Sequence, residues 1–125
     1  MKNTLLTTIP TWGPIFKIAF SMFIKSYPGV LYTNILHMTK TGNDCCGVGE
    51  RCPSLYLLSS GGLMLATEID GNGNVAEETD PLKKAVWLDV VIQQRPSGNA
   101  VKRHCTSNMN DNKFSPFYLL NFVIT

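Results

Sequence analysis

The chain has 125 residues, of which 44% are hydrophobic and 16% charged, enough for one hydrophobic core and too few for two. We therefore expect a single domain over residues 1–125. The formal net charge of +2 comes from 11 Lys and Arg against 9 Asp and Glu, scattered without a basic run that could neutralise a phosphate backbone. The composition argues against nucleic acid as a partner.

The beginning of the chain lacks the pattern of a secretory leader, because the residues after Met1 and Lys2 are rich in threonine and soon reach Pro10. The most apolar stretch, residues 15–24, contains Lys17 and Ser21 and is about half as long as a membrane helix. We expect neither a leader nor a membrane span.

The first predicted strand covers residues 15–25, where apolar and polar residues alternate. Its inward face is predicted to carry Phe16, Ile18, Phe20, Met22 and Ile24. A turn with Pro28 and Gly29 leads to a second strand over residues 30–39. Strict alternation would place Tyr32, Asn34, Leu36 and Met38 on one face and Leu31, Thr33, Ile35 and His37 on the other.

Two leucine-rich runs, residues 55–58 and 63–69, flank a glycine-containing segment and predict an antiparallel hairpin. Residues 70–74 are a dense turn signal, and the acidic residues 77–81 extend it as a solvated loop.

A further strand begins at Ala85 or Val86 and runs to Gln94, with a turn after it. Leu88, Val90 and Ile92 are its predicted core residues, and Trp87 is assigned to packing. Residues 117–124 form the last apolar strand, and residues 100–115 have no period and stay unplaced. Five or six strands without intervening helices predict an antiparallel all-β sandwich or barrel.

The order of these parts carries a resemblance to a known family. Its pieces are the long alternating strand at 16–25, residues 33–37 and 49–57, the hairpin into Leu63, residues 69–74 and the tryptophan at 87. Over residues 12–94 the chain resembles the concanavalin A-like jelly roll in its laminin-G-like branch.

The resemblance implies an antiparallel β-sandwich that serves as an extracellular module and binds carbohydrate or protein. The likeness fades after Gln94. A missing or replaced C-terminal strand would leave an open sheet edge, through which the chain could self-associate.

Three of the four cysteines lie in the glycine-broken segment 43–53. Clustered cysteines in small β modules commonly form disulfides in oxidising compartments. A bond between neighbours would strain the peptide, so we expect Cys45 or Cys46 to pair with Cys52 and the other with Cys105. A zinc site that draws on Cys45 or Cys46, Cys52, His104 and Cys105 lacks the usual knuckle spacing, and free buried thiols are the third alternative.

Asp70, Asn72 and Asn74 resemble the first half of an EF-hand loop, but Val75 stands where that loop needs glycine and Pro81 where it needs glutamate. Laminin-G-like modules can carry a calcium ion at the rim of the sandwich, so calcium is the one cofactor that remains as a candidate. A plain Asx-rich turn is the simpler interpretation.

Two carboxylates, Glu68 and Asp70, share one side of a strand, as in retaining glycosidases of this fold. The further glutamate that such enzymes use is absent, and the expected role of the pair is a solvated strand end. Neither His37 nor His104 accompanies a nucleophile motif, and His37 is expected to be a strand residue that bonds a neighbour.

Trp12, Tyr27, Tyr32 and Tyr56 could offer flat apolar faces to a sugar ring, although such residues more often pack in cores or at edges. The favoured hypothesis is a non-enzymatic extracellular recognition or adhesion module for a glycan or a protein. A glycoside hydrolase of the same fold and a self-associating structural module are the alternatives.

Overall fold

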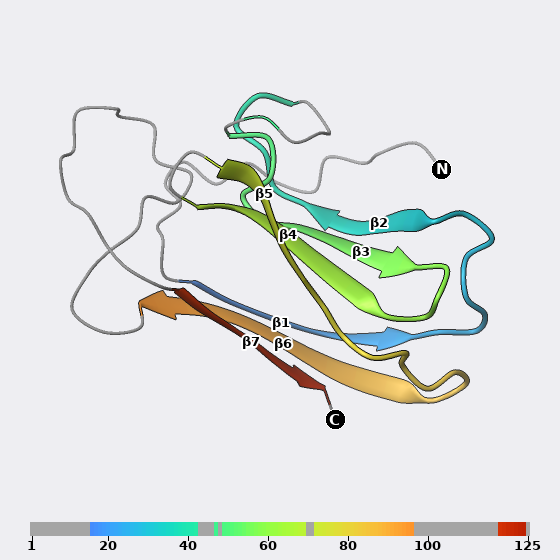
Figure 1. The fold of residues 1–125 in the computed structure, drawn as a ribbon. Coiled ribbons are helices and arrows are strands. Elements are labelled where there is room, and N and C mark those ends of the chain that lie inside the picture. Colours follow the sequence, from blue (N-terminus) through green and yellow to red (C-terminus); the bar gives the residue numbers. More distant parts are fainter. Residues whose placement is uncertain (1–15, 43–46, 48, 70–71, 97–117, 125) are drawn as a thin grey trace, which may run out of the picture.

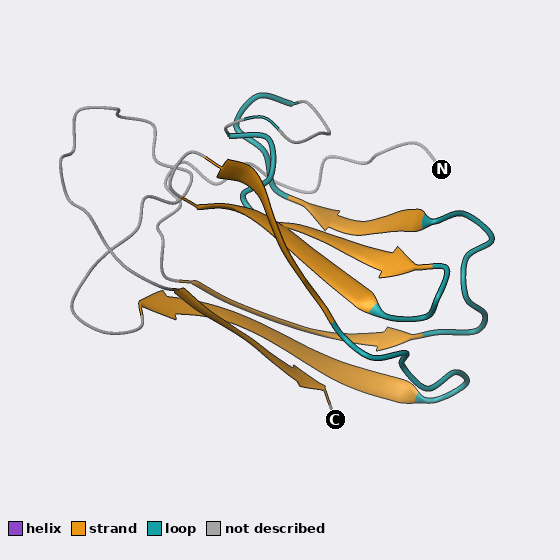
Figure 2. Ribbon diagram, in the orientation of Figure 1, coloured by secondary structure: helices purple, strands orange, loops and turns teal. Residues whose placement is uncertain are grey.

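The structure of the protein is a computed structural model, and it describes residues 16–42, 47, 49–69, 72–96 and 118–124. This part of the chain is all-β: it contains antiparallel strands and no helix (Figure 2). Its seven strands are β1 (Phe16–Phe23), β2 (Tyr32–His37), β3 (Ser54–Leu58), β4 (Leu63–Ile69), β5 (Asn72–Glu78), β6 (Trp87–Pro96) and β7 (Tyr118–Ile124).

The strands form two sheets, which lie as two layers in Figure 1. The three-stranded sheet has the order β1-β6-β7, and the four-stranded sheet is a meander in the order β2-β3-β4-β5. All pairings are antiparallel. For the described residues the prediction of an antiparallel all-β fold is confirmed, and the arrangement is sandwich-like.

In the three-stranded sheet, β6 is central and β1 pairs with it in unbroken register from Phe16 opposite Gln94 to Phe23 opposite Trp87. The alternation predicted for β1 is confirmed, because exposed residues alternate with buried and half-buried ones along the strand. The last predicted strand is confirmed as β7, which pairs with β6. β6 itself extends to Pro96, beyond its predicted end at Gln94.

The four-stranded sheet contains the predicted hairpin, in which β3 pairs with β4. It also contains a strand that the pattern did not predict. Residues 72–78, expected within a turn and a solvated loop, form the edge strand β5 and pair with β4. Its described side chains are mostly exposed, so the strand has little of the apolar alternation by which strands are recognised.

The strict alternation predicted for β2 is wrong. The register shifts between Asn34 and Leu36, so an irregularity there places Leu36 opposite the core residue Leu55. Tyr32 and Asn34 keep the opposite face. An irregularity of this kind adds a residue to one strand and reverses the facing beyond it, which a period-two pattern cannot anticipate.

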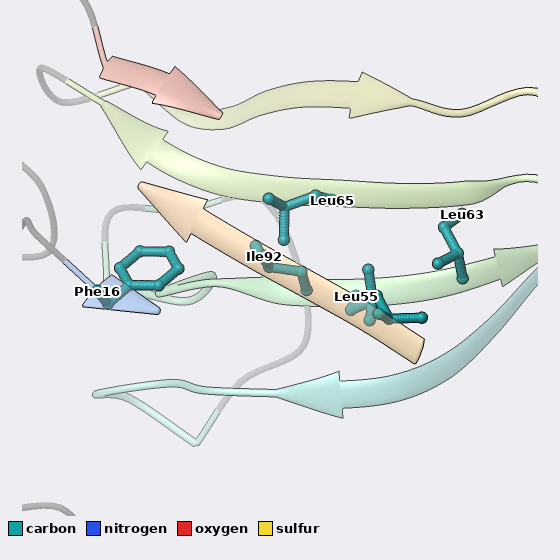
Figure 3. Close-up of a cluster of buried hydrophobic side chains, with 6 residues drawn as sticks. Phe16, Leu55, Leu63, Leu65 and Ile92 are labelled. Carbon is teal, nitrogen blue, oxygen red and sulfur yellow. The ribbon is translucent and has the colours of Figure 1, made fainter. Parts of the chain in front are cut away.

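The core lies between the sheets and draws on both of them (Figure 3). One cluster of buried side chains contains Phe16, Leu55, Leu63, Leu65, Val90 and Ile92. The predicted core residues of β6 are all buried. The predicted packing of Trp87 is wrong, because its side chain is 72% exposed; its ring lies tilted against Phe23 at a centroid distance of 5.7 Å.

One end of the molecule is closed by Tyr27, in the connection between β1 and β2. Its hydroxyl donates to the carbonyl of Leu82, and the Leu82 amide donates to the carbonyl of Gly61 at 3.0 Å. Gly61 has φ +94°, and a Cβ there would lie 2.5 Å from Cζ of Tyr27. Glycine is therefore required for both its backbone angle and the space beside the ring.

Candidate functional site

The outer face of the four-stranded sheet carries two of the aromatic residues that the sequence singled out. Tyr32 of β2 and Tyr56 of β3 lie on this face, with ring centroids 6.1 Å apart and ring planes at 73°. Tyr32 is 52% exposed, whereas Tyr56 is 6% exposed and belongs to a second buried cluster with Leu58, Met64 and Ala66. An exposed ring thus leans edge-on against a buried one.

Arg51 joins this pair from the segment that leads into β3. Its guanidinium carbon lies 5.4 Å from the centroid of the Tyr56 ring, within the range of a cation–π contact. Nη1 of Arg51 donates a hydrogen bond to Oδ1 of Asn74 on β5. The guanidinium therefore spans the sheet from β3 to its β5 edge. We call Tyr32, Arg51, Ser54, Tyr56 and Asn74 together the tyrosine face.

Two hydroxyl groups of the tyrosine face are buried without a hydrogen-bond partner in the described part of the chain. They are Oγ of Ser54, whose residue is fully buried, and Oη of Tyr56. The two residues are two apart on β3, so their side chains project from the same side of the sheet. Burying an unsatisfied hydroxyl costs about 1–3 kcal/mol, so each needs an explanation.

Residues 49–53, the described end of the glycine-broken segment 43–53, continue the β2–β3 hairpin. The amide of Met38 donates to the carbonyl of Pro53 at 2.9 Å, and the amide of Lys40 donates to the carbonyl of Gly49 at 2.8 Å. His37 contributes its Nε2, which bonds the carbonyl of Glu50 at 2.5 Å. The prediction that His37 bonds a neighbour is confirmed, and the hairpin extension fixes the backbone that carries Arg51.

Cys52 is disulfide-bonded. Cys45, Cys46 and Cys105 all lie outside the described residues, so the pairing stays a prediction, as does the absence of a Cys45–Cys46 bond. A sulfur held in a disulfide is not available as a thiolate ligand, which removes Cys52 from the zinc alternative. The bond lies directly beside Arg51 in sequence.

The prediction that Glu68 is a solvated strand end is wrong. Its side chain is 5% exposed, and its Oε2 accepts a hydrogen bond from the amide of Gly49 at 2.6 Å. The carboxylate also acts on Lys40: burial lowers the pKa of that ammonium below its usual value, and the charge of Glu68 opposes the shift. Glu68 thus holds the backbone at Gly49 against β4.

The calcium candidates have other partners in the structure. Oδ1 of Asn72 accepts the Asn74 amide at 3.1 Å, which is an Asx turn, and Oδ1 of Asn74 accepts the Arg51 guanidinium. Asp70 lies outside the described residues. Among the residues that are described, no three His, Cys, Asp or Glu side chains gather as metal ligands would.

The structure therefore brings together three of the predicted site residues, Tyr32, Tyr56 and Asn74, and leaves Trp12 outside its described part. Arg51 was missed. No periodicity marks an arginine that precedes a strand, and its position at the end of the glycine-broken segment was the one available signal. Ser54 was missed because a serine that begins a strand has no distinctive pattern.

Comparison with known proteins does not assign this face, because no family, no curated protein and no solved structure matches the chain. Within the described residues there is also no helix with the length and hydrophobicity that crossing a bilayer requires.

Proposed function

We propose that the chain is a non-enzymatic extracellular recognition module with a laminin-G-like jelly-roll fold, which binds a glycan through the tyrosine face. The resemblance over residues 12–94 supports the fold and the class of module. The disulfide at Cys52 supports an oxidising compartment. Two packed antiparallel sheets are what such a fold requires.

The observation that carries the proposal is the pair of unsatisfied hydroxyls at Ser54 and Tyr56 beside an arginine. Sugars present several hydroxyls, each of which donates and accepts. Tyrosine and serine hydroxyls, a guanidinium and an amide are matching partners for them, and the half-exposed ring of Tyr32 offers an apolar face. Binding sites commonly combine aromatic surface with a few polar groups in this way.

Arg51 serves as both a cover and a contact in this proposal. The hydroxyl of Tyr56 is buried, so a ligand reaches it only when a side chain over the ring moves, and Arg51 lies over that ring. A sugar that draws the guanidinium away from Asn74 would gain a charge-assisted hydrogen bond and uncover Tyr56.

The environment of Glu68 supports a binding function over hydrolysis. A catalytic carboxylate must reach the substrate, whereas Glu68 is buried and bonded to the backbone of Gly49. Its partner in the glycosidase hypothesis, Asp70, lies outside the described residues.

The test is a glycan array probed with the folded, disulfide-intact chain, with and without a calcium chelator. We expect glycan binding that Arg51→Gln and Tyr56→Phe each weaken and that Lys83→Gln, an exposed control, leaves unchanged. Binding that survives the chelator places the ligand on the tyrosine face, and binding abolished by the chelator favours a calcium site at residues 70–74. Silence on the whole array, with binding to an extracellular protein, would replace the glycan with a protein partner.

A further inference from the structure

The edge of the three-stranded sheet at β1 carries few of the features that protect a sheet edge. Among the described residues β1 has one neighbouring strand, β6. Along its length Lys17 is the one charged residue, and its inward-facing Ile18, Phe20 and Met22 are half-buried although they pack against the core. Such an edge is a template for pairing with another strand.

Two other edges carry features that oppose self-pairing. β2 has an irregular register between Asn34 and Leu36. β5 ends with Glu77 and Glu78, both exposed, and charged side chains on an edge strand oppose pairing with another strand. These are devices by which natural sheets avoid edge-to-edge association.

Pairing of β1 with β1 of a second copy has a register in which the faces match. With the two-fold axis at Ala19, Lys17 lies opposite Ser21 of the other copy on the outer face, and Ile18 lies opposite Phe20 on the inner face. Residues directly opposite in an antiparallel pair share a face, so the half-buried apolar residues of both copies meet.

This register also pairs opposite charges. Ser21 lies opposite Asp89 of β6, and its hydroxyl donates to Oδ1 of Asp89 at 2.6 Å. An open depression in the surface beside them is lined by residues that include Ala19, Ser21, Asp89 and Val91. Lys17 of the second copy lies opposite Ser21, with strand β1 between it and Asp89 of β6. It can lay its aliphatic stem over this depression and its ammonium against Asp89.

We propose that two copies of this chain associate through antiparallel pairing of their β1 strands, with Lys17 of each copy bound to Asp89 of the other. The contact is isologous, so the charge pair forms twice. It would join the two three-stranded sheets into one continuous sheet of six strands and cover the half-buried side chains of β1. The inference is independent of glycan binding, which uses the other sheet.

The test is sedimentation equilibrium over a range of concentrations, with a charge swap. We expect a reversible dimer that weakens as salt rises. Lys17→Asp and Asp89→Lys should each raise the dissociation constant by about tenfold or more, because like charges then face each other. The double variant should restore the parent value. Glu78→Lys makes the same charge change as Asp89→Lys but at an exposed position of β5, and it should leave the dissociation constant unchanged.

A second measurement does not depend on the variants. Zero-length carbodiimide coupling of a mixture of unlabelled and ¹⁵N-labelled chain should give a mixed-isotope peptide that joins Lys17 to Asp89. A parent chain that stays monomeric at every concentration would overturn the proposal. So would a dimer without that coupled peptide, or folded single variants that the double variant does not rescue.

Discussion

Removing the hydroxyl of Tyr56 should make the protein more stable, which is the opposite of the usual effect of Tyr→Phe at a buried site. The hydroxyl is buried and has no hydrogen-bond partner among the described residues, so folding removes it from water without compensation. That loss costs about 1–3 kcal/mol. The Tyr56→Phe ring keeps its edge contact with Tyr32 and its place beneath Arg51. We therefore expect the free energy of unfolding to rise by about 1–3 kcal/mol.

The assay is urea unfolding of the disulfide-intact parent and variant, monitored by far-ultraviolet circular dichroism. The comparison requires that the free energy of unfolding depend equally steeply on urea concentration in both proteins. Tyr32→Phe is the matched control, because that ring is 52% exposed, and its effect should stay within about 0.5 kcal/mol. A lower free energy of unfolding for Tyr56→Phe would refute the reasoning, since it would mean that the hydroxyl makes a stabilising bond in the folded chain.

Three further predictions concern the fold and are checked by the same unfolding assay. Leu65→Ala should lower the free energy of unfolding by about 2–5 kcal/mol, because Leu65 is fully buried between the sheets; a loss below about 1 kcal/mol would contradict that packing. Gly61→Ala should cost more than about 1 kcal/mol, since the new Cβ meets the Tyr27 ring at positive φ, whereas Gly29→Ala, with nothing within 4 Å, should be near neutral. Burial lowers the pKa of Lys40, so between that lowered value and 10.5 the unfolded chain binds more protons and stability should rise with pH; Lys40→Met should remove this part of the rise, and an unchanged pH profile would contradict it.

Much of the fold followed from period-two patterns, because burial on one face of a strand leaves an alternating record in the sequence. The facing of β1 and the core residues of β6, such as Val90 and Ile92, are examples. The pattern fails where a strand buries little, as in β5, or where the register shifts, as at Asn34. The exposed Trp87 shows that an aromatic residue at the start of a strand need not face the core.

The candidate site was predicted in part. Tyr32 and Tyr56 were candidates because they are aromatic. The sequence did not predict that their rings lie against each other. Arg51 comes from an irregular segment whose path is set by backbone bonds to β2 and by the carboxylate of Glu68. Contacts of that kind depend on the three-dimensional path of the chain and leave no periodic trace.

The most direct test of the central claim is the affinity of the parent and of Tyr56→Phe for one glycan identified on the array, measured by titration calorimetry. If the buried hydroxyl is kept for a ligand, the variant should bind about tenfold more weakly or worse while being the more stable protein, since a lost hydrogen bond to a ligand hydroxyl is worth about 1.4 kcal/mol or more. Equal affinity of the two proteins would show that the ligand does not use Tyr56, and it would contradict the assignment of the tyrosine face as the binding site.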